Sequence, residues 1–176
     1  QSGEDPSYKS EDILDLIKKI RANYPVFIFL SVGERDDEFY RKAFDAGAKA
    51  VLFRFETSDS SLYSKLHPHS SLKERIRYLE MFKDIGYIIA SGSLIGLPGQ
   101  KPESIIDDFM FAKELSCDMY SFGPFIPHPN TPLYGHNLPD TEYVLKAISV
   151  LRLIDPYGKI LVTTALESID FQTRRQ

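Results

Sequence analysis

Short apolar runs alternate along the chain with segments in which apolar residues recur every three or four positions. The runs at 26–31, 50–54, 87–90, 119–122 and 160–163 predict strands, and unbroken apolar runs are typical of strands covered on both faces. Helical spacing predicts helices over 10–23, 36–47, 71–85 and 141–154, a short helix over 60–66 and another that begins at residue 102. This alternation predicts a parallel α/β sheet with its helices outside, in one domain over 1–176.

Capping residues support the predicted helix ends. Ser10 is expected to cap the first helix, and Ser71 together with Glu74 forms a capping box at the start of 71–85. Gly47 and Gly86 are expected to end the helices that precede them.

The predicted strands end in small groups of Ser, Gly, Thr and charged residues. These groups are Ser31-Val32-Gly33-Glu34, Arg54-Phe55-Glu56-Thr57, Ser91-Gly92-Ser93, Ser121-Phe122-Gly123-Pro124 and Thr163-Thr164, and Ser2-Gly3-Glu4-Asp5 resembles the end of a further strand. Parallel strands direct their carboxyl ends to one rim, where α/β folds keep their active sites. The sequence therefore predicts a single site built from these six groups.

The strand-end segment 51–56 divides into two faces. Its odd-numbered positions are apolar, whereas the opposite face carries Arg54 and Glu56. A cation and an anion that point inward must be satisfied by each other or by a ligand, so a structural ion pair and a binding site both remain open.

Three other features near the strand ends are candidates for binding. Glu4 after Gly3 suits an ammonium group or a capped turn, and Arg75 suits a ligand carboxylate or a solvated helix surface. The Gly-rich segment 91–99 lacks the signature of a phosphate-binding loop and better suits a platform for a flat ring. His67 and His69 flank Pro68 without a nearby acidic partner, which favours a surface loop over a metal site.

Charge and cysteine content exclude several classes of function. The net charge of −4 gives no basic surface for nucleic acid, and no apolar run approaches the ~20 residues of a membrane span. One cysteine, Cys117, permits no intramolecular disulfide, which favours a reducing, cytoplasmic location. It also excludes a cysteine-ligated metal cluster built from this chain alone.

In order, the strand-end segments resemble those of radical S-adenosylmethionine (SAM) enzymes, most closely the HydE-type [FeFe]-hydrogenase maturase beside biotin synthase and methylornithine synthase. The matching segments are Gln1-Ser2-Gly3-Glu4-Asp5-Pro6, Ser31-Val32-Gly33-Glu34, Arg54-Phe55-Glu56-Thr57, the runs 92–100 and 123–133, and Thr163-Thr164-Ala165. The resemblance implies a partial (β/α)8 barrel whose first strands and last units are missing, so the chain is expected to be a piece of a longer protein.

The resemblance also implies roles for individual residues. Its cofactor-binding positions are Ser2, Gly3 and Glu4, which hold the methionine ammonium of SAM, then Glu56, Arg75 facing the carboxylate, and the adenine-contacting Ser93, Ile95 and Gly96. Its substrate-cavity positions are Arg54, Thr163 and Thr164. The family's CxxxCxxC motif, which holds a [4Fe–4S] cluster, is absent; its place would be before Gln1, so the cluster is expected in the full-length parent only.

The implied function is reductive cleavage of SAM to a 5′-deoxyadenosyl radical that attacks a small-molecule substrate, in hydrogenase maturation. A methylornithine synthase-like or biotin synthase-like enzyme is one alternative. An inert α/β module that binds an amino-acid-like molecule through Arg54, Glu56 and Arg75 is another. The 176 residues alone are expected to be inactive and to self-associate through exposed barrel edges.

Overall fold

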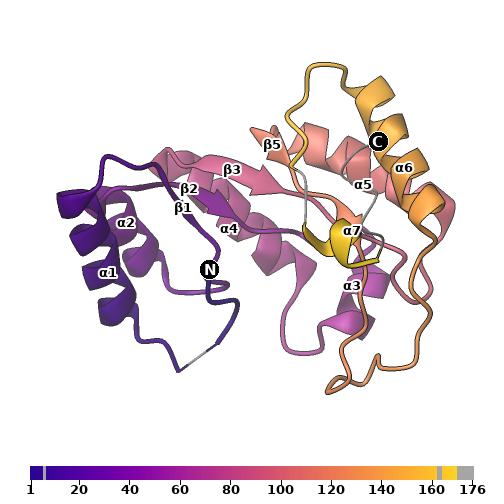
Figure 1. The fold of residues 1–176 in the computed structure, drawn as a ribbon, viewed down its shortest axis with the longest axis horizontal. Helices are drawn as coiled ribbons and strands as arrows, with labels where there is room; N and C mark the ends of the chain where they lie inside the picture. The colour runs from indigo at the N-terminus through magenta and orange to yellow at the C-terminus, as the bar shows by residue number, and fades with distance from the viewer. Residues whose placement is uncertain (6, 162–163, 170–176) are drawn as a thin grey trace.

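A computed structural model describes residues 1–5, 7–161 and 164–169 of the chain (Figure 1). In chain order the elements are α1 (Ser10–Asn23), β1 (Ile28–Leu30), α2 (Asp37–Ala46), β2 (Ala48–Leu52), α3 (Ser60–Leu66), α4 (Leu72–Ile85), β3 (Ile88–Ser91), β4 (Leu94–Ile95), α5 (Pro102–Glu114), β5 (Met119–Tyr120), β6 (Gly123–Pro124), α6 (Thr141–Ile154) and α7 (Thr164–Ile169).

The strands form a parallel sheet whose spatial order follows the chain. Strands β1, β2, β3 and β5 pair in that order, and β4 pairs with β6 beyond the ends of β3 and β5. An isolated bridge between Glu56 and Ser93 continues the pairing past β2. An order that never reverses is that of a barrel segment rather than of a doubly wound sheet, so the predicted partial barrel is confirmed.

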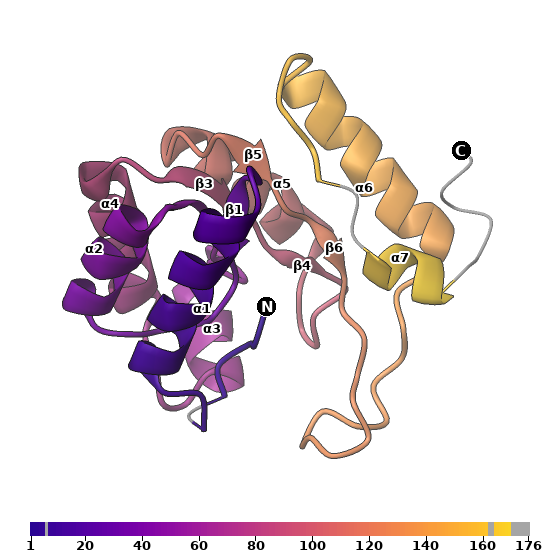
Figure 2. The same cartoon turned by 60° about the vertical axis from the view of Figure 1, so that its left-hand side comes forward.

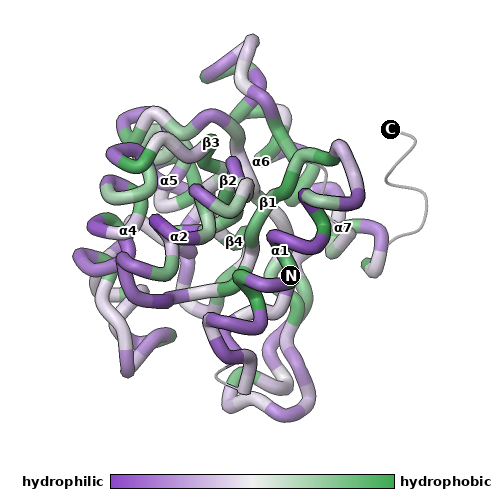
Figure 3. The backbone as a smooth tube through the Cα atoms, turned by 90° about the vertical axis from the view of Figure 1, so that its left-hand side faces the viewer, coloured by the Kyte–Doolittle hydropathy of each residue, from purple (hydrophilic) through white to green (hydrophobic). Residues whose placement is uncertain are grey.

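The helices pack on the sheet and on one another. Helix α2 packs on β2, α4 on β3, α1 on α2 and α6 on α5. Figure 2 shows α1 and α2 at one end of the molecule and α6 at the other, with the strands between them. The helices carry both hydrophilic and hydrophobic residues (Figure 3), as expected of helices that bury one face and expose the other.

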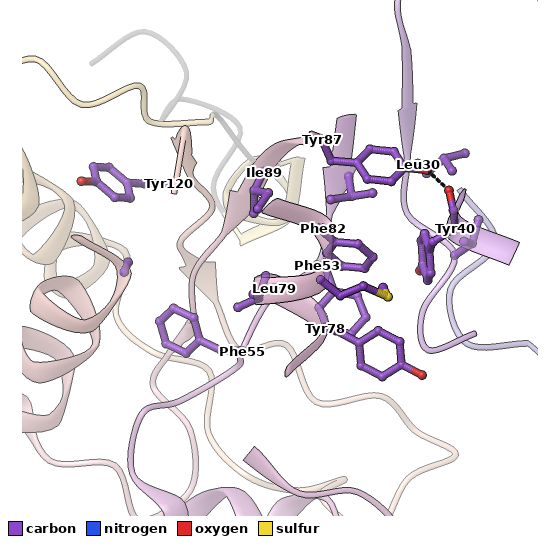
Figure 4. Close-up of a cluster of buried hydrophobic side chains, with 14 of the residues drawn as sticks. Leu30, Tyr40, Phe53, Phe55, Tyr78, Leu79, Phe82, Tyr87, Ile89 and Tyr120 are labelled. Carbon is purple, nitrogen blue, oxygen red and sulfur yellow. Dashed lines mark hydrogen bonds between the residues drawn. The ribbon is translucent and has the colours of Figure 1, made fainter. Parts of the chain in front are cut away.

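Aromatic side chains dominate the core between the sheet and helices α2 and α4 (Figure 4). The rings of Tyr40 and Phe82 meet edge to face with centroids 4.5 Å apart, and the Tyr87 hydroxyl donates to the Tyr40 carbonyl at 2.6 Å. Burial raises the pKa of both tyrosines, so these hydroxyls stay protonated and hold their partners. This core holds the strands, and with them their carboxyl ends, in a fixed position.

Most helix ends follow the predicted capping, with one exception. Ser71 Oγ accepts from the Glu74 amide at 3.1 Å, which is one half of the predicted capping box, whereas the Glu74 carboxylate accepts from Arg77 Nε at 2.7 Å. Gly47 and Gly86 end α2 and α4 in the left-handed conformation. The prediction for Ser10 is wrong: the N-cap of α1 is Lys9, without a side-chain cap, and Ser10 is the first helical residue.

Each predicted strand differs from the structure at its bounds: 50–54, 87–90 and 119–122 correspond to β2, β3 and β5, and the first and last strands differ as well. The first begins at Ile28, because Val26 and Phe27 are 45% and 59% exposed and outside the ladder. In the last, Ile160 makes an isolated bridge to Tyr120, and Thr164 opens helix α7 instead of following a strand. Thr163 lies outside the described residues.

Candidate functional site

A cavity of about 640 Å³ lies at the carboxyl ends of the strands. Six of the residues that the sequence marked as binding positions line it: Gly3, Glu4, Arg54, Glu56, Arg75 and Thr164. The N-terminal segment, the ends of β1 and β2, the segment between α3 and α4 and the start of α7 all contribute. The predicted convergence of strand-end groups on one rim therefore holds for these residues.

The two faces of segment 51–56 are separated as predicted. Phe53 and Phe55 are buried in the core, whereas Arg54 and Glu56 face the cavity. The Arg54 Nε and Glu56 Oε1 atoms are 3.5 Å apart, so the pair satisfies one carboxylate oxygen. The other, Glu56 Oε2, is buried and has no hydrogen-bond partner among the described residues. A buried orphan acceptor beside a cavity is the kind of group a ligand donor completes.

Glu56 also has an uncommon backbone conformation. Its φ is 70°, in the left-handed region that non-glycine residues seldom adopt. Hydrogen bonds hold it there: its amide donates to the Gly92 carbonyl at 3.1 Å, and its carbonyl accepts from the Leu94 amide at 3.2 Å. Such conformations cluster at ligand sites, where the surroundings over-determine them.

Arg75 reaches inward from the first turn of α4 and is 7% exposed, so it is not a solvated helix residue. Its Nε donates to the Arg54 carbonyl at 2.9 Å, and its Nη1 donates to Glu4 at 2.7 Å and Glu34 at 2.8 Å. Burial opposes its charge, but hydrogen bonds and attraction from the two carboxylates prevail and raise the pKa of Arg75. The guanidinium is thus charged and fixed.

Gly33 allows Glu4 to approach Arg75. A Cβ at Gly33 would lie 2.1 Å from the Glu4 Cγ atom, so any side chain there would displace Glu4. The φ of Gly33 is 71°, which further favours glycine. The Ser2 amide donates to the Ser31 carbonyl at 3.0 Å and aligns the N-terminal segment with the end of β1.

A hydrogen-bonded chain behind Arg75 joins it to the α3–α4 segment. Ser70 Oγ donates to Glu34 at 2.9 Å and lies 3.2 Å from the Tyr63 hydroxyl, while the Tyr63 ring stacks on His67 at 4.6 Å. His67 lies on the loop that follows α3, as predicted, and it also lines the cavity. Among the described residues no three His, Cys, Asp or Glu side chains are placed to hold a metal ion.

The two ion-paired groups at this site carry one net negative charge, to which Glu34 contributes from behind Arg75 and not from the cavity lining. Glu4, Glu34 and Glu56 contribute three carboxylates, and Arg54 and Arg75 contribute two guanidiniums. A partly desolvated site with this balance favours a ligand that carries net positive charge.

The remaining predicted positions lie apart from the cavity lining. Ser93 and Ile95 are fully buried, and the Gly96 amide donates to the Gln100 side chain. The platform predicted in this Gly-rich segment thus adjoins the site through Glu56 but does not face the cavity in this structure.

Sequence reasoning missed Glu34 and Asp108. Glu34 was within a strand-end group, so its position was a signal that it contributes to the site. Asp108 is completely buried on α5, beside Ile105 and Phe109, and a carboxylate on an apolar helix stripe was the signal that could have identified it.

Comparison with known proteins places the chain in a family. No family model matches it. It is 41% identical over 169 residues to the [FeFe] hydrogenase maturase subunit HydE of Thermotoga maritima, covering 96% of this chain and 48% of that protein. It is 33% identical over 175 residues to 3-methylornithine synthase of Methanosarcina acetivorans, covering 98% and 50%. The crystal structure of methylornithine synthase superposes with a TM-score of 0.78 and 32% identity, covering 90% of this chain and 47% of that one.

The chain belongs to the radical SAM superfamily. It spans about half the length of the curated relatives it matches. Members of the radical SAM superfamily are enzymes that use SAM and a [4Fe–4S] cluster. The cavity fits SAM, because the orphaned Glu56 Oε2 and the net negative charge suit a ligand with cationic groups.

The radical SAM cluster, in contrast, does not fit the residues of this chain. The sequence has one cysteine and cannot supply three thiolates. Burial raises the pKa of Cys117 to about 11, so its thiolate is scarce near neutral pH.

No helix in the described part of the chain is long and apolar enough to cross a membrane.

Proposed function

We propose that the cavity at the strand ends binds SAM, as part of a radical SAM enzyme of the hydrogenase-maturase type. The observation that carries the proposal is that one cavity is lined both by the buried, fixed guanidinium of Arg75 and by Glu56, whose buried Oε2 atom has no hydrogen-bond partner among the described residues.

The charges of SAM complement this arrangement. SAM has an ammonium, a sulfonium and a carboxylate, so it carries one net positive charge against the net negative charge of the site. Glu4, with Ser2 and Gly3, would receive the ammonium, and Arg75 would receive the carboxylate. The hydrogen bonds among the described residues use Nε and Nη1 of Arg75, which leaves its second terminal nitrogen for that carboxylate.

The other assigned positions complete the proposal. The segment that carries Ser93, Ile95 and Gly96 and hydrogen-bonds to Glu56 would form the adenine side of the site, with the partly exposed Gly96 nearest the ligand and the buried Ser93 and Ile95 behind it. Arg54, Thr163 and Thr164 would face a small-molecule substrate; Arg54 and Thr164 line the same cavity. In this superfamily SAM supplies a 5′-deoxyadenosyl radical on one-electron reduction. The residues of this chain would orient SAM and the substrate and exclude water.

The proposed hydrogenase maturation and the methylornithine synthase-like alternative differ in their substrates. The identity of 41% to HydE favours hydrogenase maturation over the methylornithine synthase-like alternative at 33%. A biotin synthase-like reaction is supported about as well as the methylornithine synthase-like one, by 32% identity over 161 residues to the biotin synthase of Sulfurihydrogenibium sp.. The inert-module alternative differs in its ligand, because it would bind free methionine as well as SAM.

We propose further that the chain is cytoplasmic and self-associates at the edge formed by β1. Tyr24, Val26 and Phe27 beside that edge are 62%, 45% and 59% exposed, and unpaired strand edges with apolar neighbours promote association. Light scattering after gel filtration should give a mass above one chain, which Phe27→Glu should lower. A monomer at high concentration would contradict this.

With a net charge of −4 we expect no binding to nucleic acid.

Calorimetric titration tests the central proposal. The wild type should bind SAM more tightly than S-adenosylhomocysteine, which lacks the sulfonium charge, and should bind methionine weakly. Glu56→Gln should lower SAM affinity by about tenfold or more, because a hydrogen bond to a charged group contributes about 1.5–3 kcal/mol. Glu80→Gln, an exposed change on α4, is the matched control. Equal affinity for SAM and methionine would favour the inert module.

A further inference from the structure

Asp108 is a buried acid with no part in the proposed contacts to SAM. It lies on the inner face of α5 and is fully buried, in the same helix as the buried Ile105, Phe109 and Ala112. A carboxylate in such a place is costly unless hydrogen bonds satisfy it. The identity of its donors therefore indicates what it holds in place.

One oxygen of Asp108 holds the residues that directly follow Glu56. Asp108 Oδ1 accepts from the Ser58 amide and from Ser58 Oγ, both at 2.6 Å, and more distantly from Thr57 Oγ1 at 3.5 Å. Two short bonds to one residue fix the chain immediately after the left-handed conformation of Glu56.

The other oxygen faces the Gly-rich segment. Gln100 Nε2 lies 3.5 Å from Asp108 Oδ2 and donates to the Leu94 carbonyl at 2.9 Å. Gln100 Oε1 accepts from the Gly96 amide at 2.7 Å and the Leu97 amide at 3.2 Å. Gln100 thus closes the turn over 94–100, and Asp108 contacts the Gln100 side chain.

Both segments supply proposed contacts to one ligand. Glu56 is on the first, and Gly96 is on the second; the Leu94 amide joins them directly through the Glu56 carbonyl at 3.2 Å. A binding constellation works only when its members are held in register by supporting hydrogen bonds.

We propose that Asp108 is a positioning residue that sets the Glu56 segment and the Gly-rich segment in register for SAM. This inference rests on the proposed function and deepens it, since it assigns a residue that contacts no ligand. A merely structural role would give Asp108 an effect on stability and none on the affinity of the folded protein.

Asp108→Asn separates these roles, and Asp107→Asn is the matched control on the exposed side of the same helix. Titration with SAM is done where circular dichroism shows both variants to be folded. We expect Asp108→Asn to bind SAM about tenfold more weakly and Asp107→Asn to match the wild type. Wild-type affinity in Asp108→Asn would overturn the inference while leaving the proposed function intact. If Asp108→Asn does not fold, Ser58→Ala, which removes one of the two short bonds, should weaken binding in the same direction.

A measurement without ligand keeps the inference testable if the wild type binds no SAM, which would defeat the proposed function. Amide hydrogen exchange by NMR should be faster in Asp108→Asn at Ser58 and also at Gly96 and Leu97, relative to Asp107→Asn. Faster exchange at Ser58 alone would show that Asp108 does not reach the Gly-rich segment, and the inference would fail.

Discussion

Arg75 and Glu4, which are 71 positions apart in the chain, form a 2.7 Å ion pair at the mouth of the cavity. The two side chains differ in environment, since that of Arg75 is 9% exposed and that of Glu4 is 56% exposed. Arg75 is therefore a fixed cation of the interior, whereas Glu4 is free to exchange its partner. A zwitterionic ligand that takes both groups would need to move Glu4 alone.

Replacing Glu4 should reduce affinity without much loss of stability. Arg75 keeps its bonds to Glu34 and the Arg54 carbonyl, and a glutamine at position 4 can still accept from it, so Glu4→Gln should lower the free energy of unfolding by only about 1 kcal/mol in urea denaturation. Its affinity for SAM should fall about tenfold because the ammonium loses its carboxylate. Binding of 5′-methylthioadenosine, which has no amino-acid group, should not change. Equal losses for both ligands would show that Glu4 does not receive the ammonium.

Arg75→Lys should destabilise the fold, in contrast to Arg77→Lys on the same helix. A lysine keeps the charge but loses the bond to the Arg54 carbonyl and the guanidinium packing 4.0 Å above the Phe53 ring. We expect a loss of about 2 kcal/mol in the free energy of unfolding. The Arg77 side chain is 41% exposed and pairs with Asp37 and Glu74, so its change should cost less than about 1 kcal/mol.

Comparable losses in the two variants, measured by urea denaturation, would contradict the view that Arg75 is a fixed interior cation. Circular dichroism before denaturation provides the check that both variants begin from the same fold.

Much of the fold could be predicted because local signals agree with the tertiary structure. Capping by Ser71, helix ends at Gly47 and Gly86, and the two faces of segment 51–56 all follow local rules and were confirmed. Val26 and Phe27 misled the prediction of β1, since apolar character alone does not show whether a partner covers a residue.

Within the candidate site, the sequence pattern predicted which residues lie at strand ends but not which side chains contact one another. Whether Arg75 pointed inward depended on how α4 packs, which spacing does not determine. The contact of Asp108 with Ser58, 50 positions away, is invisible to any local pattern. Thr164 was expected at a strand end and instead opens α7, although it still lines the cavity.

The stability of the chain should carry a pH signature of Asp108. Burial raises the pKa of this carboxyl above 3.8 in spite of its hydrogen bonds, so the unfolded chain releases its proton at lower pH than the folded one. The free energy of unfolding of the wild type, relative to that of Asp108→Asn, should therefore fall as the pH rises from the unfolded to the folded pKa of Asp108. Above the folded pKa it should level off. Urea denaturation from about pH 3 to about pH 7 measures it. A rise over the same interval would contradict the direction of the shift.

Cys117 should react slowly with alkylating reagents in the native protein. Its pKa is raised by burial from 9.0 to about 11, which reduces the thiolate fraction at neutral pH about a hundredfold. Iodoacetamide labelling followed by mass spectrometry should be at least tenfold slower than for the same chain in urea. Similar rates in both conditions would show that the fold does not shield this partly buried thiol.

An amide NMR titration with SAM tests the central claim most directly, because it reports where a ligand binds as well as whether it binds. The account predicts saturable shifts concentrated at the residues around the cavity, with Gly3, Gly33 and Glu56 among the largest. Saturation should need about tenfold more SAM in Glu56→Gln and the same amount as the wild type in Glu80→Gln. The absence of saturable shifts, or shifts centred away from the strand ends, would contradict it.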